Sequence, residues 1–160
     1  MLFVEELIEN KIKALKYAVN SIYDILREVI EENKNLFEDL NTQQLDKGLN
    51  ALDEKITAPP ELGYKFYAPY TIIEKKLNNQ EHRFITLEDE GKFHKSITVK
   101  IEDSGFSMDA TDSKKTKLVI KYGEEILGIT EENLSKIMNE QIVYYIISTI
   151  NEKIQNYKNL

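Results

Sequence analysis

Apolar residues recur at steps of three and four along the first 38 residues, which is the spacing of one helical face. The recurring positions are Val4, Leu7, Ile8, Ile12, Leu15, Ala18, Val19, Ile22, Ile25, Leu26, Val29 and Ile30. No glycine or proline interrupts the run, so the pattern predicts an N-terminal helix over residues 1–38. At 1.5 Å per residue its length is roughly 50 Å. The sequence leaves three interpretations open: the segment is one long core helix, it breaks, or it extends past the core to meet a neighbouring subunit.

A second helical pattern occupies residues 130–157. Thr130 is the expected N-cap, because its hydroxyl can accept a backbone N–H of the first turn. Glu131 and Glu132 follow, where carboxylates interact favourably with the helix dipole. Residues 142–147 read Ile-Val-Tyr-Tyr-Ile-Ile and are apolar on all sides. We therefore expect this segment to be deeply buried or covered by a partner.

Residues 86–129 carry the alternation of β-strands. Apolar and polar side chains alternate over residues 97–101, and again over 106–110 after a predicted turn at Asp103-Ser104-Gly105. This pattern predicts an antiparallel hairpin. Residues 118–122 fit either a strand or a helical turn, and residues 125–129 fit an extended connection.

Residues 39–85 are predicted to form a long irregular loop. Glycine and proline, which resist regular helix and central strand, punctuate the segment at Gly48, Pro59, Pro60, Gly63 and Pro69. Residues 71–77 within it are compatible with a short helix. Together the patterns predict one α+β domain over residues 1–160, with the long N-terminal helix and the C-terminal helix packed on a small antiparallel sheet.

Four aromatic residues within the loop are candidate interface residues: Tyr64, Phe66, Tyr67 and Tyr70. Large aromatic side chains at such positions either pin a loop onto the core or anchor a partner protein. The sequence leaves both interpretations open.

Composition restricts the classes of function. The chain is 41% hydrophobic and 31% charged, as expected of a globular protein. Its net charge of −7 argues against nucleic-acid binding that depends on overall charge. It has no cysteine, which removes disulfides, thiol nucleophiles and thiolate metal sites. It contains no apolar run of about 18 residues, so no membrane span is expected, and its first residues lack the basic start of a signal peptide.

Catalytic motifs are missing from the sequence. His82 and His94 are the two histidines, and their spacing matches no zinc motif. No serine stands in a nucleophile elbow, and no glycine-rich loop is suited to phosphate. We therefore expect no catalytic residues, no cofactor and no metal. An alternative that the residues leave open is a metal-dependent enzyme using Glu88, Asp89 and His94.

A lysine cluster offers a possible phosphate-binding patch. Its members are Lys95, Lys100, Lys114, Lys115, Lys117 and Lys121. Asp103, Asp109 and Asp112 lie among these lysines in the sequence. A mixed, solvated surface is therefore the favoured interpretation.

One segment has an order of residue types that resembles a known family. Residues 87–96 read Leu-Glu-Asp-Glu-Gly-Lys-Phe-His-Lys-Ser. This resembles the Leu-x-Asp-Thr-Gly-x-Leu/Phe-x-x-Ser step of tail-completion and neck proteins of tailed bacteriophages, with Glu90 where the family has threonine. The resemblance extends over roughly residues 45–130. It includes the Ala-Pro stretches of residues 48–59 and 67–76, and Tyr122-Gly123 after the hairpin.

The residues of this step suggest structural tasks. Asp89 can accept backbone N–H groups across the turn, and Gly91 permits an unusual backbone conformation. Phe93 is expected to enter the core, and Ser96 to lead into the strand. Asp89, Gly91, Phe93 and Ser96 are therefore predicted to form a structural turn without catalytic function.

The resemblance implies a structural virion protein of a tailed phage or prophage, joining head to tail as a neck or tail-completion ring. It implies a homo-oligomer with other phage neck and tail proteins as partners, and nucleic acid only by proximity in an assembled channel. The expected location is the virion, assembled in the host cytoplasm. The alternative is a small phage-encoded regulatory or inhibitory protein that binds one partner through the aromatic residues.

Overall fold

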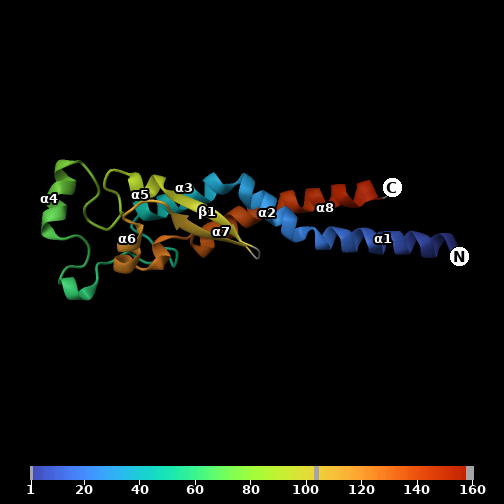
Figure 1. Ribbon diagram of the computed structural model, residues 1–160, viewed down its shortest axis with the longest axis horizontal. Coiled ribbons are helices and arrows are strands. Elements are labelled where there is room, and N and C mark those ends of the chain that lie inside the picture. The colour runs from blue at the N-terminus through green and yellow to red at the C-terminus, as the bar shows by residue number, and fades with distance from the viewer. Residues whose placement is uncertain (1, 103–104, 158–160) are drawn as a thin grey trace.

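The protein is elongated, with both chain termini at one end (Figure 1). The computed structural model describes residues 2–102 and 105–157. Two helices, α1 (Leu2–Asn20) and α8 (Val143–Tyr157), lie side by side at the end that carries the termini. We call this pair the stalk. The rest of the described fold, residues 22–102 and 105–142, forms what we call the head.

The N-terminal helical run is broken into three helices. They are α1, α2 (Ile22–Glu32) and α3 (Lys34–Asp46). At both breaks a side chain donates to the carbonyl four residues earlier: Ser21 Oγ to Tyr17 O at 2.9 Å, and Asn33 Nδ2 to Val29 O at 2.7 Å. Such bonds compete with the helical ladder and bend or interrupt it. The break that the sequence left open thus occurs twice, and the predicted end at residue 38 is corrected to Asp46.

Helical structure also replaces part of the predicted loop over residues 39–85. The elements there are the end of α3, a 3-10 turn η1 (Pro60–Leu62) and α4 (Pro69–Leu77). The short helix expected at residues 71–77 is confirmed as part of α4. Helix α4 lies at the end of the molecule opposite the termini (Figure 1).

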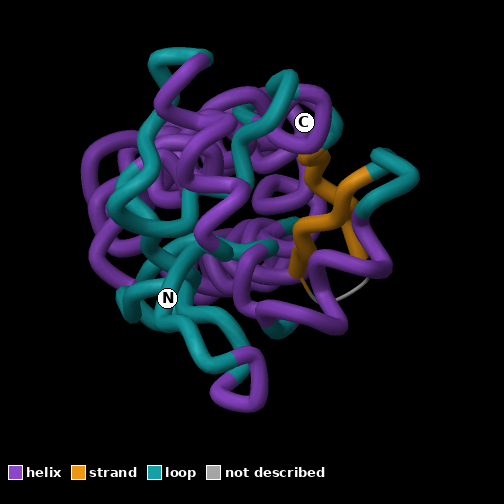
Figure 2. Tube along the Cα trace, turned by 90° about the vertical axis from the view of Figure 1, so that its left-hand side faces the viewer, coloured by secondary structure: helices purple, strands orange, loops and turns teal. Residues whose placement is uncertain are grey.

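The predicted hairpin is present. Strands β1 (Ile97–Glu102) and β2 (Gly105–Ala110) pair antiparallel, with Ile97 opposite Ala110 and Ile101 opposite Phe106. The two strands lie to one side of the helices (Figure 2). Gly105 of the expected turn begins β2, whereas Asp103 and Ser104 lie outside the described residues. The α+β class predicted from the sequence is therefore confirmed.

Short helical elements flank the hairpin. They are α5 (Lys92–Lys95) before it, and α6 (Lys115–Tyr122) and η2 (Glu124–Ile126) after it. Residues 118–122 are therefore helical, and the extended connection predicted over 125–129 begins instead with the end of a 3-10 turn.

The C-terminal helical region is also segmented. It consists of α7 (Glu131–Ile137), a π-helical turn η3 (Met138–Ile142) and α8. The N-cap prediction is confirmed, because the Thr130 side chain accepts the Asn133 N–H at 3.3 Å. Ile142 is buried, whereas Val143, Tyr144 and Ile147 are exposed. The protein thus leaves part of this apolar segment uncovered.

Two apolar clusters stabilise the head, and the hairpin belongs to both. Ile97 packs with Leu45, Ile85 and Ile126, whereas Val99 packs with Phe37 of α3. Helix α3 also forms hydrogen bonds with the segment that leads into α7.

Among the described residues no helix is long and apolar enough to cross a membrane.

A polar network joins α3 to the segment that leads into α7. Buried Asn41 donates through Nδ2 to Gly128 O at 2.9 Å, and buried Gln44 donates through Nε2 to the same oxygen at 3.1 Å. Gln44 Oε1 accepts both the Thr130 N–H and Asn133 Nδ2 at 2.9 Å. Because buried polar groups are costly unless they are paired, this network fixes one arrangement of α3 and α7.

Candidate interaction surfaces

The four candidate aromatic residues divide into two kinds. Tyr64, Phe66 and Tyr67 are half-buried and pack against the core cluster around Leu45 and Ile85. Tyr67 also accepts the Thr86 N–H through its hydroxyl at 2.9 Å. Tyr70 is 69% exposed. Core packing therefore occupies the first three side chains, and Tyr70 is the member of the set that is available to a partner.

Lys75 fastens α4 to the segment that carries the family resemblance. It is 5% exposed, its Nζ donates to Glu88 O at 2.6 Å, and it lies 4.9 Å from the centre of the Tyr67 ring. A cation over an aromatic face is stabilised by the ring quadrupole. Sequence reasoning missed this residue, because a lysine in a charged helical segment gives no sign of burial.

Residues 87–96 form the turn and strand entry that the sequence suggests. Gly91 has a φ of +74°, Phe93 is buried in the core, and Ser96 Oγ donates to Phe93 O at 2.7 Å directly before β1. Asp89 has a different partner from the expected backbone groups. The Lys114 ammonium donates to its carboxylate at 2.7 Å and holds the pKa of Asp89 below its usual value.

A cavity of about 340 Å³ lies between α4, this turn and α6. Two ion pairs lie in its lining, in which Asp89 binds Lys114 and Glu90 binds Lys92. Tyr122 closes one side, and burial raises the pKa of its phenol. The charged lining consists of five carboxylates and three lysines, so the cavity has a modest excess of negative charge and does not favour an anionic ligand.

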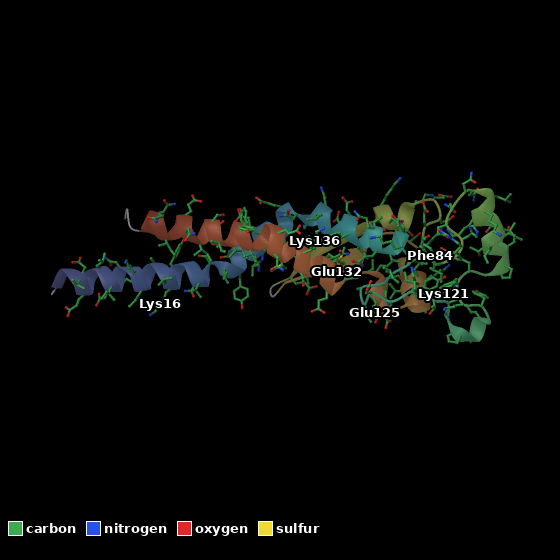
Figure 3. All side chains as sticks on the ribbon, turned by 180° about the vertical axis from the view of Figure 1, so that it is seen from behind. Lys16, Phe84, Lys121, Glu125, Glu132 and Lys136 are labelled. Carbon is green, nitrogen blue, oxygen red and sulfur yellow. The ribbon has the colours of Figure 1, made fainter. Side chains whose placement is uncertain are left out.

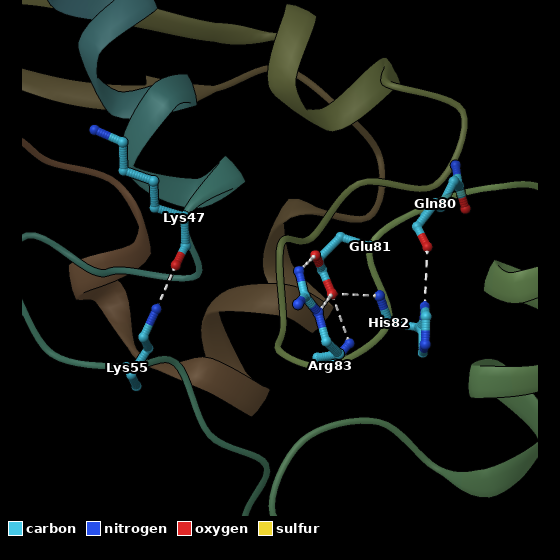
Figure 4. Close-up of polar contacts among 6 residues, drawn as sticks. All are labelled: Lys47, Lys55, Gln80, Glu81, His82 and Arg83. Carbon is cyan, nitrogen blue, oxygen red and sulfur yellow. Dashed lines mark hydrogen bonds and ion pairs between the residues drawn. The ribbon is translucent and has the colours of Figure 1, made fainter.

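Both histidines form contacts with nearby polar groups of the chain. His94 Nε2 donates to Thr86 O at 2.8 Å, and its Nδ1 lies 3.4 Å from Asp46 Oδ1. His82 Nδ1 lies 3.3 Å from Gln80 O (Figure 4). In the described part of the chain, no three His, Cys, Asp or Glu side chains are placed to hold a metal ion, Glu88, Asp89 and His94 included.

The turn beside His82 is organised by one carboxylate. Glu81 Oε1 accepts the backbone N–H of Arg83 at 2.8 Å, and Glu81 Oε2 pairs with Arg83 Nη2 at 2.7 Å (Figure 4). This guanidinium lowers the pKa of Glu81 to about 2. In the same view Lys55 Nζ donates to Lys47 O at 2.6 Å, which ties residue 55 back to the end of α3.

Three of the six lysines of the cluster form ion pairs with aspartates. Asp109 pairs with both Lys100 and Lys115, and Lys114 pairs with Asp89. Asp103, one of the acidic residues of this prediction, lies outside the described residues. These pairs agree with the mixed surface that the sequence favours over a phosphate-binding patch.

The stalk exposes an apolar stripe along α1. Val4, Ile8, Ile12, Leu15 and Val19 follow each other at helical steps and are 46–62% exposed. We call these five residues the α1 stripe. Ala14, on another side of the same helix, is 3% exposed, and α1 packs against α8. The helix therefore has one apolar side that the fold covers and a second that it leaves open.

A second exposed apolar row lies on α4, at the far end of the molecule (Figure 1). Tyr70, Ile73 and Leu77 are separated by three and four residues, which places them on one side of the helix. All three are exposed, Leu77 to 79%. We call them the α4 row. Sequence reasoning identified Tyr70 but not its two aliphatic neighbours, although their spacing gives the signal.

Comparison with known proteins returned no match: no protein-family model, curated protein or solved structure matches this chain.

Proposed function

We propose that this protein is a structural subunit of a larger assembly, and that the assembly is the neck or tail end of a tailed-phage or prophage virion. In this role it forms a homo-oligomeric ring that joins head to tail, together with other neck and tail proteins. The protein reaches the virion from the host cytoplasm, and nucleic acid contacts it only by proximity in the assembled channel.

The observation that carries the assembly role is the α1 stripe. Five exposed aliphatic side chains on one side of a helix are costly to keep in water, and contiguous exposed apolar surface marks interaction sites. The phage context has a separate support, which is the resemblance of residues 87–96 to the tail-completion and neck step.

Ring formation needs a heterologous contact, in which one patch of a subunit meets a different patch of the next. The α4 row supplies a patch that is separate from the stalk. Its exposed Tyr70 belongs to the aromatic set that the sequence suggests as an interface. The combination of an aromatic residue and two aliphatic residues is typical of the centre of an interface.

The proposed function is tested by the composition of purified particles. We expect mass spectrometry of virions from the source phage or induced prophage to detect the protein at several copies per particle. Particles that lack the protein altogether would contradict the virion role. Deletion of the gene should leave filled heads and free tails unjoined in electron micrographs. Normal joined particles from the deletion mutant would contradict the joining role.

A second candidate function is a small regulatory or inhibitory protein that binds one partner through the α4 row. The exposure of Tyr70, Ile73 and Leu77 at the end of the molecule favours it. The two functions differ in one result. A regulator is absent from purified particles, and its Tyr70→Ser/Leu77→Ser variant loses the regulatory effect while particles remain normal.

A further inference from the structure

The α1 stripe has a definite geometry. Val4 and Val19 are its ends, and 15 residues at 1.5 Å each place them about 22 Å apart. The stripe residues point within roughly 80° of one another around the helix axis, at 100° per residue. Ala14, the buried residue of α1, points well away from them. The open side is therefore a narrow, continuous seam of the kind that pairs with another helix.

Charges along one edge of the stripe are separated by sign. Glu5, Glu9 and Lys16 lie within about 40° of one another on the same edge. Both carboxylates are in the N-terminal half of α1, and the ammonium is in the C-terminal half. Lys16 extends from α1 on the side away from α8 (Figure 3). Among the described residues, none of the three forms an ion pair within the chain.

We propose that the α1 stripe is covered by the α1 stripe of a second copy of this chain, with the two helices antiparallel and a twofold axis near Ile12. In this register Val4 of each copy meets Val19 of the other, and Ile8 meets Leu15. Two copies of Ile12 meet at the axis. Every apolar residue of the stripe thereby acquires an apolar partner.

The charges select this orientation. In the antiparallel pair, Glu5 and Glu9 of each copy lie beside Lys16 of the other, and the twofold axis makes the contact twice. In a parallel twofold pair this edge of one helix faces the opposite edge of the other, so Glu5 and Glu9 lose their contact with Lys16. A membrane surface is disfavoured because two carboxylates border the stripe and anionic lipid repels them.

The strength of the contact follows from its size. One seam of about 22 Å buries less than the roughly 1,200 Å² at which stable interfaces begin. We therefore expect a reversible dimer with a dissociation constant on the order of 1–100 μM. The proposal rests on the proposed assembly function, because it names the occupant of the same surface. The α4 row stays open as one of the two patches that a heterologous ring contact needs.

The first test is disulfide trapping, which the absence of native cysteine makes specific. Glu5→Cys and Lys16→Cys chains carrying different tags are oxidised separately and as a mixture. The antiparallel pair predicts a heterodimer from the mixture and little product from either variant alone. In a parallel pair, residues 5 and 16 are roughly 16 Å apart along the axis, whereas a disulfide needs Cα atoms within about 7 Å.

The matched control uses Glu6→Cys and Lys13→Cys. These positions carry the same two residue types in the same order on another side of α1. We expect the control mixture to give at least fivefold less heterodimer than the 5/16 mixture. Equal trapping in both mixtures, or efficient trapping of each variant with itself, would overturn the proposed geometry.

The second test exchanges the charges and measures self-association by analytical ultracentrifugation. Lys16→Glu alone, and Glu5→Lys/Glu9→Lys alone, should each weaken the dimer about tenfold because like charges then meet. The triple variant should restore the affinity of the original chain. Circular dichroism verifies that each variant is folded.

The outcomes distinguish this inference from the proposed function. A chain that stays monomeric to several hundred micromolar, or that binds anionic vesicles through an intact stripe, overturns the inference. Detection of the protein in virions would still support the assembly role in that case. Conversely, an antiparallel dimer of a protein that is absent from virions retains the inference and rejects the virion function.

Discussion

The head and the stalk use similar apolar residues with opposite results. In the head, Phe37, Leu45, Ile85 and Ile126 have no exposed surface. In the stalk, the aliphatic residues of the α1 stripe keep about half of their surface in water. The difference is one of layers, because head residues are enclosed by several elements, whereas α1 packs against α8 and leaves its other apolar side open.

An assembly subunit needs a stable conformation and a surface that binds a partner, and the two regions supply one requirement each. The head has an apolar core and a buried hydrogen-bonded network in which Asn41 Oδ1 is left without a partner, and together they favour one conformation of the head by itself. The stalk has one covered seam and one open seam, so its final burial depends on a partner. Mutations in the two regions should therefore act on different quantities, stability for the head and association for the stalk.

The largest expected effect is a cavity in the head. Phe37→Ala should lower the free energy of unfolding by about 3–5 kcal/mol, because the Phe37 ring is fully buried and lies 4.8 Å from the Phe106 ring. Chemical denaturation measures the loss. Tyr23→Ala, at an exposed aromatic residue of α2, is the control and should change stability by less than about 1 kcal/mol. Similar losses for both variants would contradict the contrast.

A smaller effect is expected from the polar network. Gln44→Leu leaves the Thr130 N–H and the Asn133 amide without their acceptor, which should cost about 1–3 kcal/mol. Urea unfolding gives the magnitude, and faster hydrogen exchange at Thr130 locates the loss. Gln43→Leu, at the exposed neighbour, is the matched control. Unchanged exchange at Thr130 in the Gln44 variant would argue against the network.

The ion pairs on the hairpin should give a modest pH dependence. Hydrogen bonds from Lys100, and next from Lys115, lower the pKa of Asp109. The unfolded chain therefore binds this proton more readily, so the contribution of Asp109 to stability is complete above its unfolded pKa of about 3.9 and is lost as the pH falls below it. Asp109→Asn should reduce the change in urea midpoint between pH 7 and low pH. Asp39→Asn, at an exposed carboxylate of α3, should leave that change intact.

The smallest effect on folding is expected in the stalk. At dilute, monomeric concentrations, Leu15→Ala should change the free energy of unfolding by less than about 1 kcal/mol, because Leu15 is 53% exposed. The same variant should weaken self-association at higher concentration. A loss above about 2 kcal/mol in the dilute protein would show that the folded chain itself buries Leu15, and the contrast between head and stalk would fail.

The predicted fold class is confirmed because hairpin alternation and helical periodicity are local signals. The helix boundaries were less accurate for a specific reason. The breaks at Ser21 and Asn33 come from side chains that bond to backbone carbonyls, and no glycine or proline marks them. The extension of α3 to Asp46 depends on Asn41 and Gln44, polar residues whose burial is decided by partners more than 80 residues away.

The sequence by itself determined the amphipathic helices, the hairpin, the Thr130 cap and the turn at Gly91, because each depends on neighbours within a few residues. Only the tertiary structure decided which apolar residues are covered. It divided the aromatic set into three residues of the core and an exposed Tyr70, and it buried Lys75. It also left the α1 stripe open. Periodicity gives a helix its apolar sides, but burial depends on how many other elements reach each side.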